Sequence, residues 1–151
     1  MNRFSLITGV GHGTTPLTSF DNALLSSGVA NFNLVKISSI LPPCLHLSNM
    51  VDLPEGSILY TAYAHRNTYE KDCIVSAAIA VGIPEDPNKI GVIMEFSGDC
   101  SAIESKKRAS DMVVEAMDNR EIEIKEILCE VAEGIGNGID YITAFAALSI
   151  W

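Results

Sequence analysis

The chain has 151 residues, of which 48% are hydrophobic and 19% charged, and its formal net charge is -9. This length predicts a single domain, residues 1–151, with room for one sizeable core. The acidic balance argues against nucleic acid as a partner, because phosphate backbones select basic surfaces. No apolar run reaches the roughly 18 residues needed to cross a bilayer, and no signal-peptide pattern is evident. We therefore expect a cytoplasmic protein with no membrane partner.

Four cysteines, Cys44, Cys73, Cys100 and Cys129, are scattered through the sequence, with no C-x-x-C motif and no close Cys–His pair. Structural zinc sites need ligands at short, regular spacing, so we predict no metal site. Isolated thiols of this kind are typical of proteins in a reducing compartment.

An apolar stretch from Phe4 to Val10 predicts the first strand. It leads into a glycine-rich segment, residues 9–16, which lacks the lysine of a P-loop and the third glycine of the dinucleotide motif. A tight turn is the simpler interpretation of these glycines, and His12 would be exposed in it.

The next segment, Thr18 to Ser27, predicts a short helix that is capped by Thr18 or Ser19 and ended by Gly28. Asp21 lies in the first turn of this helix. A carboxylate there suits the helix dipole, which is the simpler interpretation, and a binding role is the alternative.

The run from Asn31 to Ile40 predicts a second strand, in which alternation would place Asn33 and Ser39 on one face. Two adjacent serines, Ser38 and Ser39, end this run just before Pro42-Pro43, which cannot continue a central strand. Packing gives no reason for two hydroxyls at this place. A serine hydroxyl held against the preceding carbonyl can attack it, so Ser38-Ser39 is a candidate self-processing site.

The rest of the sequence alternates between apolar runs and turn signals. The polar segment 65–72 predicts an exposed turn, and the glycines between 134 and 138 predict a flexible one. One long helix is expected at 101–119, and strands are expected at 58–64, 73–83, 90–96, 121–132 and 141–151. About seven strands joined mainly by turns, with two helices, predict an α+β fold of mostly antiparallel sheets packed face to face.

Glu95 interrupts the apolar strand predicted at 90–96, where it stands between Met94 and Phe96. Burial among apolar neighbours favours the protonated form of a carboxyl group, which suits a general acid near neutral pH. A glutamate that faces water at a strand end is an equally good interpretation.

Several of these segments together resemble the pyruvoyl-dependent arginine decarboxylase family. The resemblance is carried by TPLTSFDNALLSSGVANFNL (15–34), KISSILPP (36–43), ILYTAYA (58–64), SAAIAV (76–81), GVIMEFSGDCS (91–101) and AFAAL (144–148). The I-S-S-I-x-P-P core together with the downstream x-M-E-[FY] strand is the specific part. The match is collinear and spans nearly the whole chain.

In that family the precursor cuts itself between the two serines. The resemblance implies that Ser39 Oγ attacks the Ser38 carbonyl and that β-elimination then frees a β chain, residues 1–38. Ser39 would become a covalent pyruvoyl group at the start of an α chain, residues 39–151. Its ketone would form a Schiff base with arginine and act as the electron sink for decarboxylation to agmatine and CO2.

The same resemblance implies roles for further residues. Glu95 would protonate the carbanion, Asn33 would hydrogen-bond carbonyl oxygens beside the pyruvoyl group, and Asp21 would bind the substrate guanidinium. The backbone of three residues would line the pocket: Leu17, Ala30 and Phe32. Phe32 is bulkier than the aliphatic residue expected there.

The resemblance also implies a four-layer αββα sandwich and a homo-oligomer of αβ protomers, a trimer or a multiple of it, with the site between neighbouring subunits. Two alternatives remain open at this point. The first is a pyruvoyl decarboxylase of another amino acid, such as histidine. The second is an unprocessed, non-catalytic oligomeric subunit.

Overall fold

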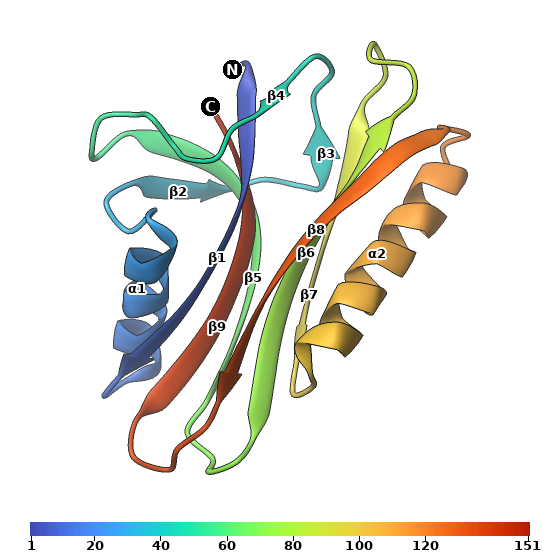
Figure 1. The fold of residues 1–151 in the computed structure, drawn as a ribbon. Helices are drawn as coiled ribbons and strands as arrows, with labels where there is room; N and C mark the ends of the chain where they lie inside the picture. Colours follow the sequence, from blue (N-terminus) through green and yellow to red (C-terminus); the bar gives the residue numbers. More distant parts are fainter.

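The computed structural model describes residues 1–151 as nine strands and two helices arranged in four layers (Figure 1). No helix is long and apolar enough to cross a membrane. The elements are β1 (Arg3–Gly13), α1 (Pro16–Ser27), β2 (Asn33–Lys36), β3 (Ile40–Leu41), β4 (His46–Leu47), β5 (Ile58–Thr68), β6 (Ile74–Pro84), β7 (Gly91–Gly98), α2 (Ala102–Asp118), β8 (Ile124–Ile135) and β9 (Tyr141–Ile150).

The strands form two sheets that face each other. One sheet has five strands in the order β2-β5-β9-β1-β4, and the other has four in the order β3-β7-β6-β8. Only the pairs β1–β4 and β2–β5 are parallel. In Figure 1, α1 covers the outer face of the five-stranded sheet and α2 covers the outer face of the other. The predicted α+β sandwich of mostly antiparallel sheets is therefore confirmed.

Three apolar clusters fill the three gaps between the four layers. The cluster between the sheets includes Ile79 of β6 and Leu148 of β9. The cluster under α2 includes Val113 and Met117, and the cluster under α1 includes Ala23. Because β6 is covered on both faces, its sequence is a nearly continuous apolar run rather than an alternating one.

The glycine-rich segment near the N-terminus is part of β1, so the turn predicted there is wrong. Gly9, Gly11 and Gly13 occupy alternate positions and therefore face the same side of the sheet, where α1 packs. A Cβ at Gly11 would overlap the backbone nitrogen of Ala23. The glycines allow this close approach of helix to strand. His12 is exposed, as predicted.

Helix α1 begins two residues earlier than predicted, and its cap differs. Thr15 is the N-cap, and it forms a reciprocal capping box with Thr18 around Pro16, the first helical residue. The caps predicted at Thr18 or Ser19 are therefore wrong. Gly28 ends the helix with φ 80°, as predicted.

The strand predicted from Asn31 to Ile40 is divided into two short strands in different sheets. β2 ends at Lys36 on the five-stranded sheet, and β3 begins at Ile40 on the four-stranded sheet. Residues 37–39 cross between the sheets, as Figure 1 shows. The predicted alternation that placed Asn33 and Ser39 on one face is wrong, because no continuous strand joins them.

Three other boundaries differ from the predictions because strand pairing overrides local polarity. β5 continues through the predicted turn as far as Thr68, which pairs with Ile142 of β9. Gly134 pairs with Val75 inside the sheet and is not part of the final turn. The two-residue strand β4 lies within the segment 45–56, for which no strand was predicted.

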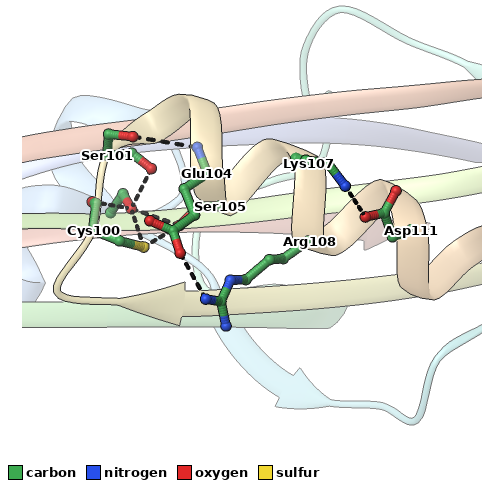
Figure 2. A network of polar contacts seen from close by, with 8 residues as sticks. Cys100, Ser101, Glu104, Ser105, Lys107, Arg108 and Asp111 are labelled. Carbon is green, nitrogen blue, oxygen red and sulfur yellow. Dashed lines mark hydrogen bonds and ion pairs between the residues drawn. The ribbon is translucent and has the colours of Figure 1, made fainter.

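A buried polar network fixes the N-terminus of α2 (Figure 2). The hydroxyls of Ser76 in β6 and Ser105 in α2 lie 2.6 Å apart, and both residues are fully buried. Ser101 Oγ accepts the Glu104 N–H, but the Glu104 carboxylate pairs with Arg108 at 2.6 Å. Ser101-Ala-Ile-Glu104 has the sequence pattern of a capping box, but only its serine half is formed.

Candidate active site

Ser38 and Ser39 lie in the segment that crosses from one sheet to the other. Ser38 is exposed, and Ser39 is half-buried at a bend. On one side the Ile37 N–H donates to the Thr61 carbonyl of β5 at 3.2 Å. On the other side the Ser39 carbonyl accepts the Ile93 N–H of β7 at 2.9 Å. The peptide bond between the serines is thus anchored to a different sheet at each end.

Strand β7 brings Glu95 next to Ser39, although the two residues are 56 positions apart. Ser39 Oγ donates to Glu95 Oε2 at 3.4 Å. Glu95 is in phase with Ile93, whose side chain belongs to the cluster between the sheets. β3 pairs with β7 only at Gly91 and Val92, so this edge of β7 has no strand neighbour beyond that point. Glu95 is accordingly half-buried.

The apolar neighbours of Glu95 in the sequence do not surround its carboxylate. Met94 and Phe96 point to the opposite face of β7 and pack in the cluster under α2. There the Arg108 guanidinium lies 5.1 Å from the centre of the Phe96 ring. The environment expected for Glu95 from these two neighbours is therefore wrong, because alternation separates them from it.

Asn33 opens β2, where its amide is bound to the loop that precedes β5. The Asn33 Nδ2 donates to the Gly56 carbonyl at 2.7 Å, and the Asn33 N–H donates to the Ser57 carbonyl at 2.9 Å. Within one chain the Asn33 side chain makes no hydrogen bond to Ser38 or Ser39. Its expected role beside the pyruvoyl group stays a prediction.

The residues expected to bind substrate lie on α1 and in the turn after it. Asp21 is exposed on α1 and takes part in none of the five ion pairs. Leu17, one turn earlier, is 75% exposed. Ala30 and Phe32 are half-buried between α1 and β2, and Phe32 packs against the cluster under α1. In one chain Asp21 and Glu95 belong to different layers, because α1 covers the five-stranded sheet and β7 is part of the four-stranded one.

An aromatic group that the sequence interpretation missed lies between α1 and β5. The ring of Phe20 is 4.6 Å from the ring of His65, and Lys36 Nζ is 4.6 Å from the centre of the Tyr63 ring. Partial burial, and then the charge of Lys36, lower the pKa of His65. The alternation of ILYTAYAH could have placed Tyr63 and His65 on one face, had the strand been extended by one residue.

Comparison with known proteins gives one consistent result. A model of the family described as pyruvoyl-dependent arginine decarboxylase matches residues 3–149. The chain is 38% identical over 150 residues to the pyruvoyl-dependent arginine decarboxylase of Methanococcus aeolicus, a match that covers 99% of this chain and 90% of the other. The identity to the protein of the same name from Methanocaldococcus jannaschii is 37%, with the same coverage. A third relative of that name, from Thermococcus kodakarensis, is 41% identical over 122 residues, 80% of this chain and 77% of the other. The chain therefore belongs to the pyruvoyl-dependent arginine decarboxylase family.

Proposed function

We propose that this chain cuts itself between Ser38 and Ser39 and that the processed enzyme decarboxylates L-arginine to agmatine and CO2. The observation that carries the proposal is the contact between Ser39 Oγ and Glu95 Oε2. It places a hydroxyl that can cut the chain beside a carboxyl group that can exchange protons with it. The choice of arginine as substrate and of a pyruvoyl group as cofactor rests on membership of the family.

The surroundings of Ser39 fit a residue that is converted into the cofactor. Ser38 and Ser39 belong to no strand, so their peptide bond can break without dismantling either sheet. After the cut, the Ser39 carbonyl would keep its hydrogen bond from the Ile93 N–H, and β3 would keep its pairing with β7. The ketone formed at position 39 would therefore stay beside Glu95.

Processing would proceed in three steps. Ser39 Oγ bonds to the Ser38 carbonyl carbon, the C–N bond breaks, and the hydroxyl proton ends on the freed amine, which turns the amide into an ester. Loss of the Ser39 α-proton then expels the Ser38 carboxylate and leaves a carbon–carbon double bond at position 39. Addition of water to the resulting imine tautomer releases ammonia and leaves the ketone of the pyruvoyl group.

The pyruvoyl group formed at position 39 would supply a ketone able to form a Schiff base with the substrate amine and to act as the electron sink for loss of CO2. Glu95 would be the general acid that delivers a proton to the substrate carbon. Asp21 would bind the guanidinium through paired, charge-assisted hydrogen bonds, and Asn33 would donate to carbonyl oxygens. The pocket walls would come from Leu17, Ala30 and Phe32.

The positions of the residues proposed to bind substrate favour a site shared between two copies of the chain. Asp21 and Leu17 are exposed on α1, and within one chain nothing links them to Ser39. If α1 of one subunit covers the crossover segment of the next, Asp21 and Glu95 act on one substrate molecule. We accordingly propose a homo-oligomer of processed protomers, a trimer or a multiple of it.

The test is a denaturing gel with intact-mass measurement, followed by an arginine assay. We expect chains of 38 and 113 residues (151 minus 38), with the longer one blocked at its N-terminus, and agmatine and CO2 from arginine. The Ser39→Ala variant should remain one chain and be inactive. An uncut wild-type chain would contradict the processing step. Processed protein that acts on histidine but not on arginine would contradict the substrate.

A further inference from the structure

Two backbone hydrogen bonds bracket the peptide bond between Ser38 and Ser39. The Ile40 N–H donates to the Ser38 carbonyl oxygen at 2.8 Å, which closes a three-residue turn with Ser39 at its centre. The Ile93 N–H of β7 holds the Ser39 carbonyl at 2.9 Å. The carbonyl that Ser39 would attack therefore already accepts a hydrogen bond from the protein.

Two side chains that could donate near the cut have acceptors other than the Ser38 carbonyl. The Asn33 Nδ2 donates one hydrogen bond, to the Gly56 carbonyl, and the Ser39 hydroxyl donates to Glu95. No side chain donates to the Ser38 carbonyl oxygen, and its one backbone donor is the Ile40 N–H. The donor that polarises the scissile carbonyl is thus a main-chain group from the residue just after the cut.

We infer that the Ile40 N–H is the oxyanion donor for self-cleavage, an inference that rests on the processing proposed above. When Ser39 Oγ bonds to the Ser38 carbonyl carbon, the carbonyl oxygen gains negative charge until the C–N bond breaks. A donor already placed on that oxygen stabilises the charge without reorganisation at the moment of reaction. Its hydrogen bond strengthens as the acceptor becomes ionic.

The residues after Ile40 keep this donor in place. Leu41 is buried, and β3 pairs Ile40 with Val92 and Leu41 with Gly91. Pro42 and Pro43 follow immediately, and their rings fix φ and remove two further backbone donors. Although Ile40 lies in β3, its N–H is bonded to Ser38 and not to β7. The short strand thereby orients the donor toward the scissile bond.

The decisive experiment removes the N–H and keeps the side chain. Cell-free synthesis with the α-hydroxy analogue of isoleucine at position 40 replaces the Ser39–Ile40 amide by an ester. The exchange also makes the Ser39 carbonyl a weaker acceptor for the Ile93 N–H, so a second variant that lacks the N–H but keeps an amide carbonyl is needed beside it. Loss of one oxyanion donor costs about 100-fold to 1000-fold in enclosed sites, and the exposure of Ser38 lets water replace part of it. We therefore expect cleavage at the Ser38–Ser39 bond to slow by about fivefold or more, measured by quenched time points and intact mass.

Two controls separate this effect from a general loss of rigidity in the segment that crosses between the sheets. The same ester at position 37 removes the Ile37 N–H bond to Thr61 in the adjoining segment, and Ile40→Ala keeps the N–H but shortens the side chain. The position-37 ester should cleave within fivefold of the wild-type rate, and Ile40→Ala gives the effect of the side chain alone, against which loss of the N–H is compared. Resistance to limited proteolysis reports whether each variant is folded.

The inference is overturned if the position-40 ester, folded by that measure, cleaves less than fivefold more slowly than wild type. It is equally overturned if the position-37 ester slows cleavage as much. Ile40→Pro lacks the N–H but keeps an amide carbonyl at Ser39, so it is compared with Ile40→Ala under the same criterion, and it replaces the ester should the ester not fold. These outcomes leave the proposed function intact, whereas wild-type protein that never cuts itself refutes that function instead.

Discussion

The phase of a single strand decides whether Glu95 can act on Ser39. Side chains alternate along β7, so Ile93 and Glu95 face the gap between the sheets while Met94 faces α2. A shift of one residue in the register would turn the carboxylate into the apolar cluster under the helix. The sequence pointed to an unusual glutamate, but the face to which it turned depended on the pairing of Ile79 with Glu95.

Asp21 is the residue whose proposed role is most directly testable. It is exposed on α1 and forms no ion pair in the chain, so its removal should leave folding and self-cleavage unchanged. A charged hydrogen bond contributes about 1.5–3 kcal/mol, so Asp21→Ala should lower kcat/KM for arginine by about tenfold to a hundredfold. The measurement is agmatine formation by fully processed variant and wild type.

The matched control for this change is Asp118→Ala, which removes the same charge from the exposed end of α2, on the other side of the sandwich. It should leave kcat/KM for arginine unchanged. An equal loss in the two variants would mean that net charge, and not a guanidinium contact at Asp21, attracts the substrate.

At the scale of elements, the glycines of β1 determine how closely α1 approaches the sheet. A Cβ at Gly11 would overlap the backbone of Asn22 and Ala23, and backbone atoms cannot rotate away as a side chain can. Gly11→Ala should therefore displace α1 and destabilise the fold by about 1–3 kcal/mol. For a chain of this size that is a fall in Tm of several degrees, roughly 2–4 °C per kcal/mol.

This comparison is best made in the uncut Ser39→Ala background at one protein concentration, so that neither cleavage nor assembly differs between samples. Gly98→Ala is the control, because its new Cβ would meet the Phe96 ring at 3.5 Å and Cys100 Sγ at 3.6 Å, which are ordinary contacts. We expect the control to unfold within about 0.5 kcal/mol of the background. A Gly11→Ala variant as stable as the control would contradict the close-packing explanation.

The long elements could be predicted because periodicity and capping signals extend over many residues. The strand expected at 73–83, which is β6, and the helix expected at 101–119, which is α2, are examples. The failures lie where tertiary contacts override local signals. The polar residues His65 and Arg66 pair with β9, and the glycines of β1 pair with the same strand. Sequence patterns do not show which strands will pair with one another.

The candidate site was predictable only in part for the same reason. Adjacent serines before two prolines marked the chemistry, but nothing local showed that the strand ends at Lys36. The prediction that Ser39 and Glu95 belong to one site came from the resemblance to the family and not from their spacing in the sequence. The role of the Ile40 N–H could not have been predicted from sequence, because every residue except proline carries the same backbone donor.

At the scale of the whole molecule, the chain passes between the two sheets four times, and the proposed cut falls on the first passage, from β2 to β3. The other passages lie between β3 and β4, β5 and β6, and β8 and β9, all within residues 39–151. Cleavage therefore leaves the longer chain still connecting both sheets. Alternation cannot reveal this arrangement, since it shows which residues share a face but not which sheet they join.

The position of β1 predicts that the two products stay together. β1 lies between β9 and β4, and ten of its residues, Phe4 to Gly13, pair with β9. The 38-residue chain also contributes α1 to the cluster that includes Phe145, and β2 to the edge of β5. Its release would require β1 to leave the interior of a sheet, which exposes apolar surface on both faces.

In native buffer both chains should therefore elute together from a sizing column, at the volume of uncut Ser39→Ala protein, and should separate only in strong denaturant. A 38-residue chain found free in native buffer would show that the peptide link, and not the sheet, holds β1 in place.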